Sequence, residues 1–394
     1  MLPIRPIRGV LVAAILAASL PTTSPLAAQG KTEEAGFIVR LGSDTLAVEQ
    51  FARSTRRLES EVATRVPHAR RIHYVASLDS LGRIARFDVT MRPVGGGGPG
   101  AMRGVVVFAA DSAEVSVTRG DSTQRMRVAA PPGTIPLTAF SEALLEQAIR
   151  QARRSGGDSV AFAWLPLGAA DAFPSAVVRR GKDSVYVELF GGPVYARVDK
   201  RGRLLGADAR ATTQKFLIDR VKRVNVGAWA TAFARAEAVR GPAGQLSPRD
   251  TLRAEVAGAH LFVDYGRPRR RGREIFGRVV PWSQVWRTGA NAATGLTIDA
   301  DISVGGTTVP GGSYTLWTIP STSGGELIVN TQTGQWGTEY DSTRDLVRVP
   351  MSRESLAAPV EQFTIAIEPR QDGALLRLSW DTTSFTVPVR VRQN

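Results

Sequence analysis

Short alternating segments separated by turn residues recur through the last third of the chain, and this pattern constrains the fold most. Apolar and polar residues alternate at 261–265, 296–302 and 363–367, and Gly305-Gly306 and Pro310-Gly311 supply turns. A period of two suits half-buried strands, and roughly eight or nine short strands joined by tight turns indicate a β-sandwich or jelly roll. We therefore predict a C-terminal β domain over residues 247–394.

The region before residue 224 shows the same alternation together with one helix pattern. Residues 85–94 and 103–130 read as strands, with the glycine-rich stretch 95–100 as a hairpin tip between them. Apolar residues recur at helical spacing over 138–154, after Thr138 or Ser141 as a possible cap, and glycines follow. We predict that residues 29–223 form an antiparallel β domain around one packed helix, so the fold class is mainly β.

An internal repeat runs through this N-terminal region. Residues 42–51 resemble 181–190, and residues 78–84 resemble 198–204, each pair with Asp-containing turns beside an alternating strand. Glu49 and Glu188 occupy matching places in the repeat. We interpret both as outward-facing strand residues, with a functional carboxylate pair as the alternative.

A second helix pattern marks the boundary between the two predicted domains. Residues 226–240 are rich in alanine, and Gly241-Pro242 follows them. A short helix and a turn-rich stretch are typical of a domain boundary, so we predict a helical linker at 224–246.

The first 28 residues have the form of a secretory signal peptide. Arg5 and Arg8 precede the apolar run 9–20, and Leu26-Ala27-Ala28 supplies small residues for cleavage near Ala28. No later segment is long and apolar enough to span a membrane. The chain contains no cysteine, which excludes disulfides and a lipid-anchored cysteine. We expect a periplasmic or secreted protein.

The formal net charge of +14 would suit a nucleic-acid ligand, but export separates the chain from that partner. We therefore expect no nucleic acid. A basic surface also suits anionic lipid headgroups or acidic glycans, and a solvated basic surface without a partner is the simpler interpretation.

Three motifs of rare residues follow one another in the C-terminal region. They are Arg-Pro-x-x-x-Gly-Arg at 267–273, Trp-Arg-Thr-Gly-Ala-Asn at 286–291 and Gln-Trp-Gly at 335–337. In this order they resemble the bacterial DUF2911 family, over about residues 247–391, and that family carries only a label of unknown function. Its members often have Glu-Ala-Thr after the second motif, where this chain has Ala-Ala-Thr at 292–294. Any role for a carboxylate there would be absent here.

The same motifs supply a candidate ligand-binding site. Indole and phenol faces beside planar polar groups suit a small polar ligand, either glycan-like or anionic. The alternative is that these residues only pack the core and satisfy backbone groups. The candidate residues are Tyr265, Arg267, Arg273, Trp286, Arg287, Asn291, Trp317, Asn330 and Trp336.

Glu361 is a separate candidate. It precedes Phe363, Ile365 and Ile367 at a spacing of two, which predicts a side chain on the core face. A buried carboxylate needs a partner, so we predict an ion pair with Arg287, or else with Arg377. Such a pair would be structural, or part of an active site if it bordered a cleft.

The sequence lacks the residue patterns that a metal site or a nucleophilic enzyme requires. The three histidines, His68, His73 and His260, are not spaced as metal ligands, and no nucleophile motif occurs. We expect no metal and no cofactor, and we favour a non-catalytic binding or envelope-associated protein. The alternatives are a glycosidase-like hydrolase that uses Glu361, and a lipid carrier that acts through the N-terminal domain. The sequence does not indicate an oligomeric state.

Overall fold

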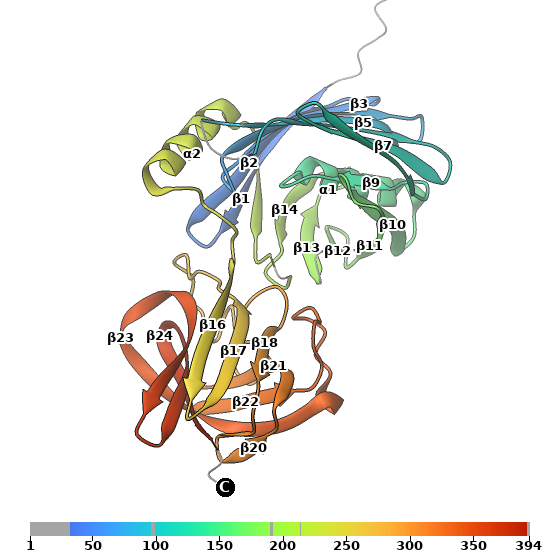
Figure 1. Ribbon diagram of the computed structural model, residues 1–394. Coiled ribbons are helices and arrows are strands. Elements are labelled where there is room, and N and C mark those ends of the chain that lie inside the picture. The colour runs from blue at the N-terminus through green and yellow to red at the C-terminus, as the bar shows by residue number, and fades with distance from the viewer. Residues whose placement is uncertain (1–31, 96–98, 190–191, 213, 392–394) are drawn as a thin grey trace, which may run out of the picture.

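The computed structural model describes residues 32–95, 99–189, 192–212 and 214–391. Its chain is mainly β, as predicted, and forms two sheets and two α-helices (Figure 1). The predicted signal peptide, residues 1–28, lies outside the described residues. Neither helix in the described part combines the length and the apolar character needed to cross a membrane.

The N-terminal sheet has fifteen strands, and its first half is a simple meander. Strands β1 to β8 pair in sequence order, each antiparallel to the next. They are β1 (Glu33–Leu41), β2 (Asp44–Arg53), β3 (Arg57–Thr64), β4 (Arg70–Leu78), β5 (Ile84–Pro93), β6 (Met102–Phe108), β7 (Ser112–Arg119) and β8 (Ser122–Ala129). Strands β5 and β6 pair antiparallel as expected, and residues 96–98 of the hairpin tip predicted at 95–100 lie outside the described residues.

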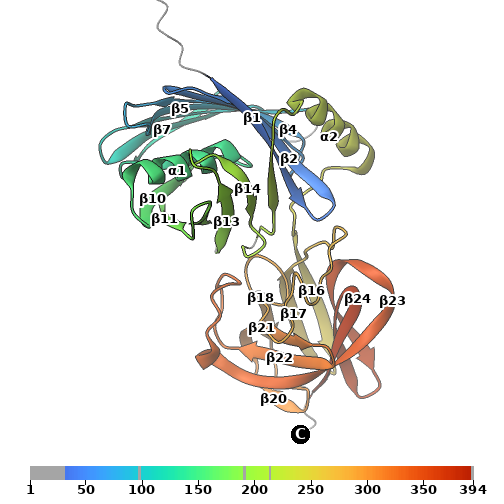
Figure 2. The same ribbon diagram turned by 180° about the vertical axis from the view of Figure 1, so that it is seen from behind.

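The second half of this sheet starts at the opposite edge and returns to β1. Strand β9 pairs parallel with β10 through a crossover that contains α1, and β15 closes against β1. The elements are β9 (Ile135–Leu137), α1 (Glu142–Ser155), β10 (Ser159–Pro166), β11 (Phe173–Arg179), β12 (Ser184–Glu188), β13 (Pro193–Val198), β14 (Leu204–Asp208) and β15 (Leu217–Val221). The sheet curls so that α1 lies on its concave side (Figures 1 and 2).

Helix α1 is buried almost all round because the sheet encloses it. Leu144, Ala148 and Ile149 pack into the large apolar core of the N-terminal sheet. The helix begins at Glu142 rather than at 138, and its predicted extent is otherwise confirmed. Residues 135–137 pair with β10 and Phe140 has a φ of 56°, so the chain cannot enter the helix earlier.

A buried ionic network fastens α1 to the sheet. Glu146 is 0% exposed and accepts the Leu204 N–H at 2.9 Å. It forms ion pairs with Arg150 at 3.0 Å and Arg220 at 2.5 Å, and both arginines also pair with Glu33 at 2.6 Å. One carboxylate therefore ties together α1, β14 and β15, and Glu33 adds β1.

The internal repeat is visible as two turns with the same hydrogen bonds. Asp79 Oδ1 accepts the Arg83 N–H at 2.8 Å, and its Oδ2 accepts from Arg83 Nε at 2.8 Å. Asp199 and Arg203 make the same two bonds at 2.9 and 2.5 Å. The two Asp-x-x-Gly-Arg turns are therefore structurally equivalent: one joins β4 to β5, and the other joins β13 to β14.

The prediction that Glu49 faces outward is wrong, whereas Glu188 is exposed. Glu49 is 0% exposed, because it lies on the concave face of β2 beneath the start of α1. The hydroxyls of Ser60 and Tyr74 donate to its Oε1, both at 2.7 Å, and the Ala143 N–H donates to its Oε2 at 2.9 Å.

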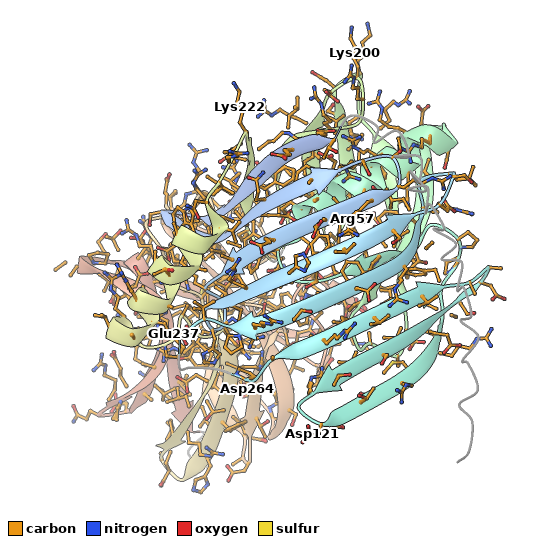
Figure 3. The ribbon with its side chains drawn as sticks, turned by 90° about the horizontal axis from the view of Figure 1, so that it is seen from above. Arg57, Asp121, Lys200, Lys222, Glu237 and Asp264 are labelled. Carbon is orange, nitrogen blue, oxygen red and sulfur yellow. The ribbon has the colours of Figure 1, made fainter. Side chains whose placement is uncertain are left out.

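Helix α2 (Val226–Arg240) matches the predicted helix at 226–240 and lies on the outer side of the sheet. Its Val226, Ala230 and Phe233 pack on Val48 and Ala63. Beyond it the outer face is polar. There Arg57 pairs with Glu59 at 3.0 Å, and Figure 3 labels Arg57 among the charged side chains of this face.

The C-terminal sheet has nine strands in the order β16-β17-β18-β21-β22-β23-β24-β19-β20. Strands β23 and β24 are long, and their pairing shifts register around Val360. One continuous sheet folds over its own core in this way, and β16 comes back against β24. The elements are β16 (Arg249–Val256), β17 (Ala259–Gly266), β18 (Thr294–Ile298), β19 (Ile302–Val304), β20 (Thr307–Val309), β21 (Gly312–Ser321), β22 (Gly324–Asn330), the 3-10 helix η1 (Ser342–Arg344), β23 (Asp345–Arg370) and β24 (Gly373–Val391).

Candidate functional site

A long loop between β17 and β18, residues 267–293, carries the first two sequence motifs. Trp286 pairs with Thr318 of β21 through two backbone hydrogen bonds of 2.7 and 2.9 Å. Thr288 is 0% exposed, and the Thr294 hydroxyl donates to its carbonyl at 2.7 Å. An isolated bridge at Trp286 and the Thr294–Thr288 hydrogen bond thus hold the segment 286–291 against the sheet.

The backbone of this loop is strained at several positions. Arg271, Ser283, Thr288 and Asn291 have φ values of 51°, 58°, 50° and 64°. A left-handed conformation costs a non-glycine residue on the order of 1–3 kcal/mol and persists only where the surroundings enforce it. Strain of this kind tends to gather at binding sites.

Two arginines of the loop are shielded from water without a carboxylate. Among the described residues neither Arg273 nor Arg287 forms an ion pair, and their polar partners are backbone carbonyls. Arg287 Nη1 donates to the Asn291 carbonyl at 3.3 Å, and Arg273 Nε donates to the Arg270 carbonyl at 2.9 Å. Burial lowers the pKa of each guanidinium to about 10. The loop thus presents two cations that form no ion pair in the described chain, although the charge of Glu361 opposes part of the pKa lowering at Arg273.

The N-terminal sheet adds a third such cation from the segment between β14 and β15. Lys215 Nζ donates to the Arg210 carbonyl at 2.8 Å. Burial lowers the pKa of Lys215 to about 8, and the nearby charges of Arg287 and Arg273 lower it further in the same direction. Lys215, Arg273 and Arg287 line the same pocket.

A contact between the β1–β2 turn and the loop holds the two parts of this site together. The Arg271 guanidinium pairs with Asp44 at 2.5 Å, and the Ser43 N–H donates to the Arg271 carbonyl at 3.1 Å. A side chain at Gly42 would collide with the same carbonyl. The tight approach therefore depends on glycine at that turn.

The three cations line a pocket of about 840 Å³ between the two sheets. Arg210 and Arg278 lie on its wall as well, and no aspartate or glutamate of the described chain lines it. Aromatic faces complete the lining, namely Trp286, Trp317, Tyr340 and Trp380. We call this the cationic pocket. Part of this lining comes from the loop 267–293 of the C-terminal part. Figure 1 shows loops of the C-terminal part on the side that faces the N-terminal sheet.

The structure brings five of the nine predicted site residues to this pocket and places four elsewhere. Arg273, Trp286, Arg287, Asn291 and Trp317 line it. The other four serve the fold or lie outside the pocket, as follows. The Tyr265 hydroxyl accepts the Ile365 N–H at 3.2 Å, Arg267 pairs with Asp250 at 2.7 Å, Asn330 donates to the Asp341 carbonyl at 2.8 Å, and Trp336 is 41% exposed beside its backbone bridge to Ala292.

The predicted ion pair of Glu361 with Arg287 or Arg377 is wrong. Glu361 is exposed, and its Oε1 accepts the backbone N–H of Arg271 at 3.0 Å. Arg377 pairs with Glu354 and Glu368 instead. The strand pairing is irregular between Val360 and Thr364, so the alternation that buries Phe363 does not extend back to Glu361.

Sequence reasoning missed the contribution of the N-terminal sheet to the pocket. Lys215, Arg210 and Phe140 carry no motif, and no local pattern connects them to the loop 267–293, which lies much later in the sequence. Tyr340 and Trp380 were also missed, although both belong to the aromatic-rich C-terminal region that drew attention to the site.

A second cavity, of about 420 Å³, lies inside the N-terminal sheet beside the start of α1. Its lining is mostly apolar and includes Met91, Leu145 and Val194. We call it the apolar pocket.

The apolar pocket has a polar side with unused hydrogen-bonding groups. Thr138 Oγ1, Ser141 Oγ and Trp164 Nε1 are buried and have no hydrogen-bond partner among the described residues. Glu142 also lines the pocket, and burial raises its pKa to about 8 with help from Glu49. Buried polar groups nearly always have a partner, so this cluster points to one that binds there.

Comparison with known proteins identifies one part of the chain. Residues 247–389 match the family model described as "Protein of unknown function (DUF2911)". The predicted resemblance is thereby confirmed for the C-terminal third. The DUF2911 part supplies Arg273 and Arg287, whereas Lys215 lies before it. The cationic pocket is therefore shared between the DUF2911 part and the preceding sheet.

Other comparisons add little. No curated protein matches the sequence. One solved structure, a crystal structure of a DUF1089 family protein from Pseudomonas aeruginosa, is 14% identical with a TM-score of 0.32, and the match covers 42% of this chain and 90% of that chain. At that score the likeness supports no argument. Within the described ranges, no group of three or more His, Cys, Asp or Glu side chains is placed to hold a metal ion.

Proposed function

We propose that this protein is an exported binding protein that holds a small anionic ligand in the cationic pocket. The observation that carries the proposal is the absence of any carboxylate from a lining that contains Lys215, Arg273 and Arg287. Cations withdrawn from water without a counter-charge are costly, and a bound anion offsets that cost.

The chemistry of the lining narrows the class of ligand. A guanidinium matches a carboxylate or phosphate through two parallel N–H donors, and a lysine ammonium adds a point charge. Trp286 and Tyr340 provide flat faces against which an organic ring or chain can pack. A small organic phosphate or carboxylate fits this combination better than a neutral sugar does.

The hydrolase alternative depends on Glu361, which does not line the pocket. No other carboxylate of the described chain lines it either. Acid–base hydrolysis of the glycosidase kind needs two carboxyl groups beside the scissile bond. We therefore propose binding without catalysis.

Isothermal titration with inorganic phosphate and with citrate tests the proposal. The double variant Lys215→Gln, Arg287→Gln should lose affinity by about tenfold or more, since each charged hydrogen bond contributes on the order of 1.5–3 kcal/mol. The matched control is Lys200→Gln, Arg201→Gln, which removes the same charges from the exposed turn at the opposite end of β14. Figure 3 labels Lys200 at that turn. Equal affinity in both double variants would overturn the proposal.

A second candidate function, transport of an apolar molecule through the N-terminal sheet, is supported by the apolar pocket. An enclosed apolar lining with a few convergent polar groups is typical of small-molecule sites. Its test is a thermal-shift comparison of decanol with glycerol. Stabilisation by decanol alone supports the candidate, and no shift with either removes it.

The exported location rests on the N-terminal pattern of Arg5, Arg8 and the apolar run 9–20. We expect the mature protein to start near Gln29. N-terminal sequencing of the protein from the periplasmic or culture fraction checks this, and an intact Met1 in that fraction would contradict it.

A further inference from the structure

The cationic pocket and the apolar pocket meet at the same residues. Ala139, Phe140 and Gln214 line both cavities. Phe140 packs against Phe216, another lining residue of the apolar pocket, with ring centroids 5.4 Å apart. The segment just before α1 thus forms the boundary between an apolar cavity and a positively charged one.

The chemical character changes in order across this boundary. Inside lie Met91, Leu145 and other apolar side chains. At the boundary lie the unpartnered hydroxyls of Thr138 and Ser141, on either side of Ala139 and Phe140. Beyond it lies Lys215, beside Gln214. Apolar, neutral polar and cationic side chains therefore lie around the junction of the two pockets.

We infer that one anionic amphiphile occupies both pockets, with its hydrocarbon chain in the apolar pocket and its phosphate or carboxylate group among Lys215, Arg273 and Arg287. The inference rests on the proposed function and deepens it by naming the ligand class. The ester or ether oxygens that join a chain to a charged headgroup would accept hydrogen bonds from Thr138 and Ser141.

Phe140 holds the boundary in a conformation that is unusual for its residue type. Its φ of 56° lies in the left-handed region, where a bulky side chain is disfavoured. The neighbouring Gln214 and Lys215 come from the segment between β14 and β15, and Lys215 also has a positive φ, of 60°. Both residues line the cationic pocket, and Phe140 also lines the apolar pocket, so an elongated ligand would pass Phe140 on its way from one pocket to the other.

Three probes separate the parts of this inference: decyl phosphate below its critical micelle concentration, ethyl phosphate and decanol. Wild-type protein should bind one decyl phosphate per chain, about tenfold or more tighter than ethyl phosphate, because added methylenes leave water. Ethyl phosphate and decanol should each displace decyl phosphate. Failure of decanol to displace it would overturn the inference without use of any variant.

Two variants test which pocket holds the hydrocarbon chain of the ligand and which holds its phosphate group. Ala209→Leu narrows the apolar pocket, since Ala209 is a small buried residue of its lining. It should weaken decyl phosphate about tenfold and change ethyl phosphate less than about twofold. Lys215→Gln with Arg287→Gln should weaken both phosphates, and the control Lys200→Gln with Arg201→Gln should weaken neither. Leu167→Trp is a second narrowing variant for use if Ala209→Leu does not fold.

The outcomes distinguish the inference from the proposed function. If a folded narrowing variant binds decyl phosphate as the wild type does, while the charge variant loses both phosphates, the shared ligand is wrong and the anion site stands. If the charge variant keeps its affinity for ethyl phosphate, the anion site itself is wrong.

Discussion

At the scale of single residues, Lys215 has a property that a surface lysine lacks. Burial lowers its pKa to about 8, so the ammonium loses its proton within the range in which proteins are commonly studied. The charge that attracts an anion is fully present well below pH 8 and is lost as the pH rises through that value.

We predict that sulfate affinity falls several-fold between about pH 7 and 9, because sulfate keeps its charge over this range while Lys215 does not. In Lys215→Arg the affinity should stay level, since arginine remains charged. Titration calorimetry at a series of pH values measures both. A wild-type affinity that does not change with pH would contradict the role of Lys215.

Glu142 and Glu49 make a second prediction at this scale. Burial raises their pKa values to about 8 and about 7, so the folded protein holds protons that the unfolded chain releases above about pH 4.5. The free energy of unfolding should therefore decrease as the pH rises from about 5 to 8.

In Glu142→Gln the free energy of unfolding should decrease less over this pH range. At pH 8 it should exceed the wild-type value by about 1–2 kcal/mol. Urea denaturation at pH 5 and pH 8 measures it. The exposed Glu188→Gln serves as the control and should follow the wild type at both values. An equal slope in all three proteins would show that Glu142 stays ionised.

At the scale of elements, α1 is held by charge as well as by apolar packing. Glu146→Ala would leave Arg53, Arg150 and Arg220 without their shared buried carboxylate. Removing one partner of a buried ionic network typically costs about 3–5 kcal/mol of unfolding free energy. Chemical denaturation should show that loss.

Glu34→Ala is the comparison, because Glu34 pairs only with the exposed Arg223. Exposed pairs contribute roughly 0–1 kcal/mol. If Glu146→Ala cost no more than Glu34→Ala, apolar contacts alone would hold the helix.

The elements also show what sequence patterns can predict. Helix α2 lies at the predicted residues 226–240, because a run of good helix formers and the following glycine are local signals. Helix α1 begins later than predicted, since pairing of β9 with β10 and the backbone of Phe140 act from outside the helix. Tertiary contacts therefore determine the first residue of α1, which local spacing could not predict.

Some residues of the candidate site could likewise be predicted from local patterns, and others could not. Trp286 and Arg287 were found from a local motif, and they line the pocket. Trp336 belongs to an equally rare motif yet lies outside, because only its backbone takes part in the bridge to Ala292. Lys215 could not be found, since only the packing of the two sheets brings it near Arg287.

At the scale of the whole molecule, the account depends on two sheets that build one site. Arg271 and Asp44 join them, and the pocket takes its cations from both sides. The prediction that residues 29–223 and 247–394 are separate folding units, joined by 224–246, remains a prediction. If both are correct, Asp44→Ala should weaken sulfate binding several-fold with little change in the unfolding of either unit, and calorimetric unfolding alongside titration measures both effects.

A crystal of the full chain soaked in selenate tests the central claim most directly, because selenate resembles sulfate and its selenium scatters anomalously. The account predicts an anomalous peak between the two sheets, within hydrogen-bond reach of Lys215 Nζ and the Arg287 guanidinium. A selenate peak only elsewhere on the surface, with this pocket accessible to solvent in the crystal, would contradict it.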